Sequence, residues 1–95
     1  MQRITLNDIE IQLEYLNALT DSPDRPWVAS TAQIGNYHLS RAYDGVCIHQ
    51  MASAGGGVRT PVTPAHISKR ECYDALVVFI KGIEVGKDLQ WKTSP

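Results

Sequence analysis

The chain has 95 residues, enough for one domain with a modest core. We expect that single domain to span residues 1–95. A formal net charge of −1 excludes the basic excess of a general nucleic-acid-binding protein, and 43% hydrophobic residues exclude a disordered chain. No apolar run approaches the ~20 residues of a membrane span, so no membrane contact is expected. Two cysteines are too few for a disulfide scaffold, which favours a cytoplasmic protein with reduced thiols.

The first predicted element is an amphipathic helix over residues 6–19. Thr5 and Asp8 have the spacing of a capping box, in which each side chain bonds the backbone N–H of the other residue. Apolar residues then recur at helical spacing, at Leu6, Ile9, Leu13, Leu16 and Leu19. The solvated side is expected to carry Asp8, Glu10, Gln12, Glu14 and Asn17. Ile11 and Tyr15 fall outside the main stripe, which leaves a second face that a partner chain could cover.

A loop over residues 20–26 leads to a short edge strand expected at residues 27–33. Residues 35–51 then read as a central β-hairpin that turns at Asp44-Gly45. A two-residue turn places Tyr43 opposite Val46, Arg41 opposite Ile48 and Leu39 opposite Gln50, and it groups His38, Ser40, Ala42, Cys47, His49 and Met51 on the other face. A three-residue turn would instead group Tyr37, Leu39 and Arg41 with Cys47, His49 and Met51.

A glycine-rich loop over residues 52–57 and an extended segment over residues 58–64 precede a second helix. Ser68 and Glu71 form its capping box, and its apolar stripe comprises Cys72, Leu76, Phe79, Ile80 and Ile83. Gly86, or already Gly82, is expected to end this helix, and residues 88–95 are too apolar for a fully exposed tail and are expected to be docked on another surface. The order of elements predicts an α+β fold: a small antiparallel sheet, built from the hairpin and a short edge strand, covered by an N-terminal and a C-terminal amphipathic helix.

Enzymatic chemistry has little support in this sequence. His38, His49, Cys47, His66 and Cys72 are the possible metal ligands, but they lack the paired spacings of structural zinc sites. Cys47 and Cys72 both occupy positions that indicate packing, and a nucleophilic thiol needs a partly exposed, electropositive setting. We therefore expect no catalytic residues, no metal and no cofactor, and a metal- or thiol-dependent enzyme is the least favoured alternative.

Anion binding is a stronger alternative, at the start of the second helix. A helix N-terminus offers backbone N–H groups and the positive end of the helix dipole. The candidate ligands are Arg59, His66, Ser68, Lys69 and Arg70. Arg59 joins them if the segment after residue 58 runs back along the sheet, and residues 55–57 could close over the anion. The partner would be a phosphate-containing small molecule.

Protein binding is the third possibility, and it rests on large aromatic residues. Tyrosine and tryptophan at a surface are enriched in protein interfaces. The candidate interaction surface comprises Trp27, Tyr43 and Trp91. The partner would be a host protein or a second copy of the chain.

Several short motifs resemble a group of small accessory proteins, without an assigned activity, that tailed bacteriophages and prophages encode. They are Gly35-Asn36-Tyr37-His38-Leu39-Ser40, Ala42-Tyr43-x-Gly45-Val46, Gly56-Gly57-Val58 and Lys69-Arg70-Glu71-x-Tyr73. Asp44 and Gln50 depart from that pattern, which expects glycine and a basic residue there. The resemblance implies a phage accessory protein in the bacterial cytoplasm that acts on a host protein or defence pathway. Together with the weak support for enzymatic chemistry and the candidate aromatic surface, the resemblance predicts a non-enzymatic protein-binding module.

Overall fold

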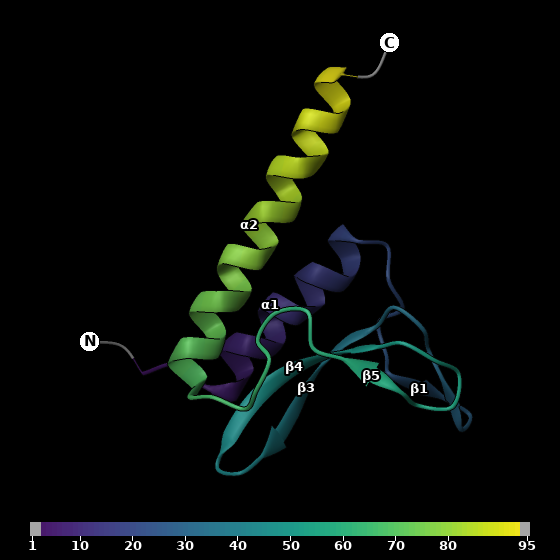
Figure 1. The fold of residues 1–95 in the computed structure, drawn as a ribbon, viewed down its shortest axis with the longest axis vertical. Helices are drawn as coiled ribbons and strands as arrows, with labels where there is room; N and C mark the ends of the chain where they lie inside the picture. Colours follow the sequence, from purple (N-terminus) through teal and green to yellow (C-terminus); the bar gives the residue numbers. More distant parts are fainter. Residues whose placement is uncertain (1–2, 94–95) are drawn as a thin grey trace.

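The structure is a computed structural model that describes residues 3–93, with side chains for residues 3–90. Its elements are α1 (Leu6–Leu19), β1 (Trp27–Val28), β2 (Thr31–Ala32), β3 (Tyr37–Ala42), β4 (Gly45–Met51), β5 (Val58–Arg59) and α2 (Lys69–Thr93). Two helices and two small antiparallel sheets make an α+β fold, as the sequence predicts (Figure 1). Both helices pack on the same face of the β3-β4-β5 sheet, because Val46 and Ile48 share one core cluster with both helices.

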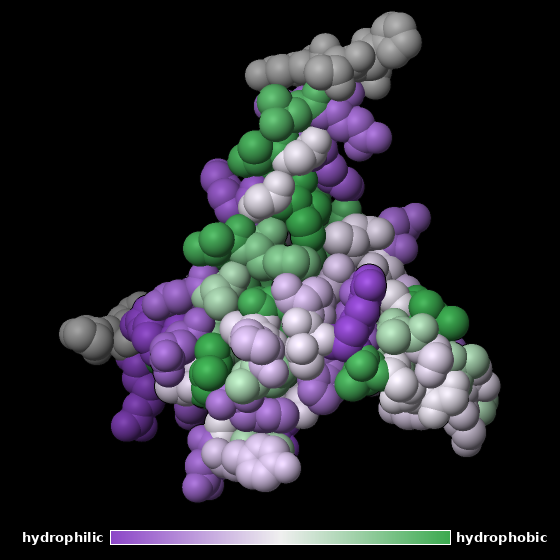
Figure 2. All heavy atoms as spheres, viewed as in Figure 1, coloured by the Kyte–Doolittle hydropathy of each residue, from purple (hydrophilic) through white to green (hydrophobic). Residues whose placement is uncertain are grey.

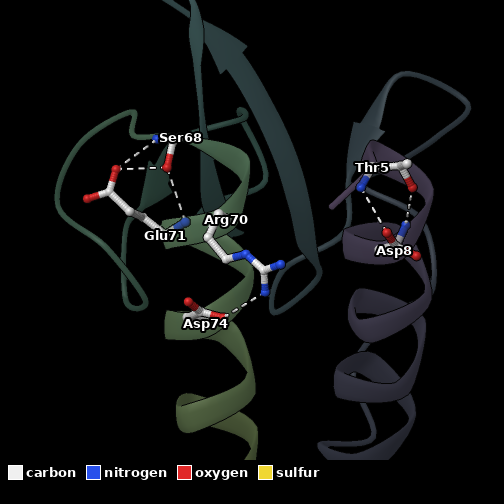
Figure 3. Close-up of polar contacts among 6 residues, drawn as sticks. All are labelled: Thr5, Asp8, Ser68, Arg70, Glu71 and Asp74. Atoms are coloured by element: carbon white, nitrogen blue, oxygen red, sulfur yellow. Dashed lines mark hydrogen bonds and ion pairs between the residues drawn. The ribbon is translucent and has the colours of Figure 1, made fainter. Parts of the chain in front are cut away.

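Both predicted capping boxes are present (Figure 3). The Thr5 N–H donates to Asp8 Oδ2 at 2.8 Å, and the Asp8 N–H donates to Thr5 Oγ1 at 3.2 Å. In α2 the Glu71 N–H donates to Ser68 Oγ at 3.2 Å, while Glu71 Oε1 accepts from the Ser68 hydroxyl at 2.8 Å and from its N–H at 3.4 Å. Each box satisfies backbone donors that the first helical turn leaves without partners, and each places a carboxylate at the positive end of the dipole.

The central hairpin turns one residue earlier than predicted. Tyr43 and Asp44 occupy the turn with φ of 53° and 58°, and Ala42 pairs with Gly45. The expected pairing of Leu39 with Gln50 is therefore wrong, because Leu39 lies opposite Ile48. The shift amounts to two residues along β4. Since side chains alternate with a period of two, the residues that the two-residue turn placed on one face of the hairpin still share that face.

The segment 27–33 is not an edge strand of the main sheet. It reverses at Ala29 and Ser30, whose φ values are 47° and 69°, so β1 and β2 pair with each other in a two-stranded ribbon. The third strand of the main sheet is β5, which pairs Arg59 with Gln50 and Val58 with Met51. The edge strand thus comes from the chain after the glycine-rich loop.

Helix α2 continues through both glycines that were expected to end it, and the docked tail predicted after residue 88 is helical through Thr93. A glycine inside a helix costs only about 1 kcal/mol relative to alanine, and the good helix formers Lys81, Glu84 and Lys87 stand close to Gly82 and Gly86. With 25 residues, α2 is about 37 Å long, against about 21 Å for the 14 residues of α1. Its C-terminal end therefore extends beyond the sheet (Figure 1).

The core forms where the apolar stripes of the two helices meet the sheet. Ile9, Leu13 and Leu16 of α1 pack with Cys72, Leu76 and Ile80 of α2, while Tyr37, Val46 and Ile48 contribute from the strands. Asn17, expected on the solvated side, is buried instead. Its Nδ2 donates to Tyr37 O at 3.0 Å, and its Oδ1 accepts from the Tyr37 N–H at 2.9 Å. Asn17 thereby ties α1 to the edge strand β3.

We predict that Asn17→Leu lowers the free energy of unfolding by about 2–5 kcal/mol, because it leaves both backbone groups of Tyr37 buried without partners. Chemical denaturation measures this loss. Asn7→Leu is the matched control, since Asn7 is exposed on the same helix, and it should change the stability by less than about 0.5 kcal/mol. Equal effects of the two variants would show that the Asn17 pair contributes little.

Candidate functional site

A cleft of about 560 Å³ opens between the tip of the β3–β4 hairpin and the first turns of the two helices. It is lined by Leu6, Arg41, Ala42, Asp44, Gly45, Val46, Ser68 and Lys69. Figure 3 shows that α1 and α2 begin side by side at this end of the molecule. Two helix N-termini and two basic side chains thus meet at one cleft.

The backbone around Gly45 sets this geometry. Val46 and Ile67 form an antiparallel bridge, with N–H to O distances of 2.8 and 2.9 Å. A Cβ at Gly45 would lie 2.9 Å from the carbonyl oxygen of Ile67, so only glycine permits this approach. The bridge places Ser68 and Lys69 next to the hairpin tip.

The structure brings together only part of the predicted anion site. Ser68 and Lys69 line the cleft, but the Ser68 hydroxyl and N–H already donate to the Glu71 carboxylate. Arg70 forms an ion pair with Asp74, at 3.8 Å. The cleft contains Arg41 in addition, which sequence reasoning missed because it placed Arg41 only by its strand face.

The other two predicted ligands lie elsewhere. His66 Nε2 is hydrogen-bonded to Ser40 Oγ at 3.0 Å. Arg59 pairs with Gln50 and donates from Nε to its side-chain oxygen at 2.8 Å. Gln50 is four residues along β4 from Val46, about 13 Å in an extended strand. The expectation that Arg59 reaches Ser68 is therefore wrong.

All three histidines of the chain form a row on the other face of the hairpin. The ring centroids of His38 and His49 are 5.7 Å apart, those of His49 and His66 are 6.0 Å apart, and the Tyr43 ring continues the row at 5.8 Å from His66. His38 and His49 are direct cross-strand partners, where the expected register made them diagonal neighbours. Burial, together with the neighbouring histidine, lowers the pKa of both His38 and His49 below the ordinary value.

This row is not arranged as a metal site. Within residues 3–93, no group of three or more His, Cys, Asp or Glu side chains could hold a metal ion. The thiols are buried as well. Burial raises the pKa of Cys72 to about 11, so its thiolate is disfavoured at neutral pH, and the Cys47 thiol donates to Thr63 O at 3.4 Å.

The predicted aromatic surface does not form one patch. Tyr43 is 93% exposed at the hairpin tip. Trp27 is half-exposed and packs on Gly56, where an added Cβ would lie 2.8 Å from the indole ring. Gly56 belongs to the loop at the opposite end of β4 from Tyr43. The side chain of Trp91 lies outside the described residues.

A different apolar surface runs along α2. Val78, Val85 and Leu89 are 71%, 49% and 56% exposed, and with Gly82 they lie on one side of the helix. We call these four residues the α2 stripe. The stripe is opposite the side that carries Leu76 and Ile80 into the core. Figure 2 shows hydrophobic residues running up the part of α2 that extends beyond the sheet, with hydrophilic residues beside them.

Sequence reasoning missed this surface because it expected the helix to end at Gly82 or Gly86. The signal was present in the chain, since residues 78, 82, 85 and 89 repeat at four, three and four positions.

Comparison with known proteins returned no match among family models, curated proteins or solved structures. In the described residues, no helix is both long and apolar enough to cross a membrane.

We predict that the protein loses stability as the pH falls below about 6.5, the ordinary histidine value. Because the folded-state pKa values of His38 and His49 are lowered, the unfolded chain binds more protons, and acid therefore favours unfolding. This contribution is fully present above about pH 6.5 and is lost as the pH falls through the folded-state values. Thermal melts between pH 7 and pH 5 measure the effect.

The control is His49→Gln, which should flatten the pH dependence of the melting temperature. NMR titration of the ring protons checks the cause directly. Midpoints at or above 6.5 for His38 and His49 would contradict the assignment.

Proposed function

We propose that this chain is a non-enzymatic protein-binding module and that the α2 stripe is its contact surface. The observation that carries the proposal is a row of aliphatic side chains that remain 49% to 71% exposed on a helix extending past the body. Exposed aliphatic residues that are contiguous mark interaction sites far more often than single ones do. A helix that presents such a row binds as one apolar face against a groove or another helix.

The rest of the fold supports this use of α2. Leu76 and Ile80 anchor its N-terminal half in the core. Two hydrogen bonds tie the middle of the helix to α1: the Tyr15 hydroxyl donates to Glu84 Oε2 at 2.6 Å, and Lys87 Nζ donates to Leu19 O. The helix is therefore held on its core side, while the opposite side stays available.

The phage resemblance suggests where the partner occurs. A small accessory protein of a tailed bacteriophage would meet a bacterial host protein or another phage protein in the cytoplasm, so a bacterial lysate is the appropriate place to test contact. The proposed partner has an apolar groove or helix with polar edges, to match an exposed apolar row that has hydrophilic residues beside it.

Site-specific photo-crosslinking tests the proposal. We predict that replacing Val85 by the photoreactive p-benzoylphenylalanine gives protein adducts of higher mass when the full chain is irradiated in a bacterial lysate. The matched control carries the same group at Val77, which is exposed on α2 outside the stripe and should give no such adducts. Equal yields at the two positions, or no adduct at Val85, would overturn the proposal.

A second candidate function is the binding of a phosphate-containing small molecule in the cleft. Arg41 and Lys69 line it, next to the first turns of two helices, and that arrangement favours an anion. Asp44 and the capping Glu71 oppose it, so simple ions should bind weakly. This candidate keeps Ser68 and Lys69 from the predicted ligand set, adds Arg41, and leaves out Arg59 and His66, which lie elsewhere.

We predict that millimolar phosphate shifts the backbone NMR signals of Arg41, Ser68 and Lys69, and that added chloride weakens the effect by screening. Arg41→Ala combined with Lys69→Ala should abolish the shifts. Arg59→Ala is the control and should leave them unchanged, because Arg59 is paired with Gln50 at the other end of β4. Unshifted signals in the unmodified chain would remove this function.

A further inference from the structure

We propose that the partner of the α2 stripe is a second copy of this chain, and that the two α2 helices pair antiparallel about a two-fold axis. The inference rests on the proposed function, since it names the occupant of the same surface. It commits to Val85 of one copy lying over Gly82 of the other, and to Leu89 lying beside Val78. Three observations on the stripe carry it.

The first is the spacing of the stripe. Residues 78, 82, 85 and 89 repeat at four, three and four positions, as the two core positions of a coiled-coil heptad do. In an antiparallel pair, 82 faces 85 and 78 faces 89, so each contact occurs twice. The same patch then serves both copies, which is what a closed two-fold dimer requires.

The second is shape. An added Cβ at Gly82 would meet nothing within 4 Å, so the helix surface there is open. The stripe thus offers a gap at Gly82 and a branched side chain at Val85, the two residues that face each other in this register. At the other contact, Leu89 meets an open apolar depression lined by Val62, Asp74, Ala75, Val78 and Phe79. The projecting Leu89 and the Val78 edge of the depression that receives it are both on α2, eleven residues apart, and Val62 of the preceding segment completes the lining.

The third is charge. Lys81 and Asp88 lie on the same edge of the stripe, both exposed. In antiparallel register, Lys81 of each copy comes beside Asp88 of the other, so two pairs of opposite charge flank the apolar contact. In a parallel pair, Lys81 of one copy would stay about 10 Å along the axis from Asp88 of the other, so this complementarity would be lost.

The side of α2 that packs on its own body faces away from the proposed contact. The core side of α2, with Leu76 and Ile80, lies opposite the stripe. Pairing through the stripe therefore leaves each sheet and each α1 on the outside of the helix pair. Val78, at 71% exposed, is open to the second helix even where α2 runs along its own body.

Sedimentation equilibrium of the purified full chain tests the state of association. We expect a mass twice the 10.5 kDa of the chain. Val85→Glu should weaken self-association about tenfold or more, because it buries a carboxylate at the helix contact. Val77→Glu, the matched control on the same helix, should leave the dimer intact, and circular dichroism should show both variants folded. A monomeric unmodified chain would overturn the inference.

Charge exchange tests the register without touching the apolar residues. Lys81→Glu and Asp88→Lys should each weaken the dimer, and the two together should restore it. Restoration fails if the residues do not meet across the pair, and that result would overturn the antiparallel register.

Disulfide trapping fixes the direction of the helices. The double variant Val78→Cys with Leu89→Cys should give covalent dimers under oxidation, whereas Leu89→Cys alone should not, because like positions are far apart in an antiparallel pair. The native Cys47 and Cys72 are buried and should contribute no background. Efficient trapping by Leu89→Cys alone would show a parallel pair and overturn the proposal.

These results separate the two levels of the argument. A monomer in solution, with the Val85 position still crosslinking a different protein in lysate, would reject self-pairing and keep the docking function. A monomer that also gives no lysate adduct would reject both. A dimer that Val85→Glu dissociates and Val77→Glu does not would support both.

Discussion

The antiparallel bridge between Val46 and Ile67 is the constraint on which most of the structure depends. It brings the chain back to the hairpin tip after β5 has paired at the other end of β4. In doing so it sets the starting point of α2 and brings His66 into the histidine row. The bridge exists because residue 45 has no side chain, so one glycine in a strand controls the placement of a 25-residue helix.

The helices were the most predictable part of the fold, because their signals are local. The capping boxes at Thr5 and Ser68 and the 3.6-residue stripes depend on residues within a few positions of each other. The hairpin was predicted only in part. Asp44-Gly45 is a strong turn signal, but Gly45 is needed for the approach of Ile67, a contact that is remote in sequence. The turn therefore moved to Tyr43-Asp44, and the alternation of faces survived because the shift was an even number of residues.

The candidate sites were less predictable than the fold, since they depend on which segments meet in space. Nothing local indicates that Arg41 and Lys69 line the same cleft, or that Asn17 bonds the backbone of Tyr37. The α2 stripe had a local signal, but two glycines were interpreted as the end of the helix. Whether the stripe is buried or exposed also depends on tertiary structure, because only the position of the sheet decides which side of α2 remains exposed.

The glycines in the outer half of α2 have a consequence for the thermodynamics of association. A helix of about a dozen residues is marginal on its own in water, and Gly82 and Gly86 each reduce its intrinsic helicity. Leu76 is fully buried in the core, whereas Val85 and Leu89 are 49% and 56% exposed, so the turns around these two residues are covered less than the earlier ones. Their amide hydrogens should therefore exchange faster than those around Leu76, in a gradient along one continuous helix. A partner that packs on the stripe would suppress this fraying, so part of the contact energy would be used to order the helix, and the association would be weaker and more readily reversible than its apolar area suggests.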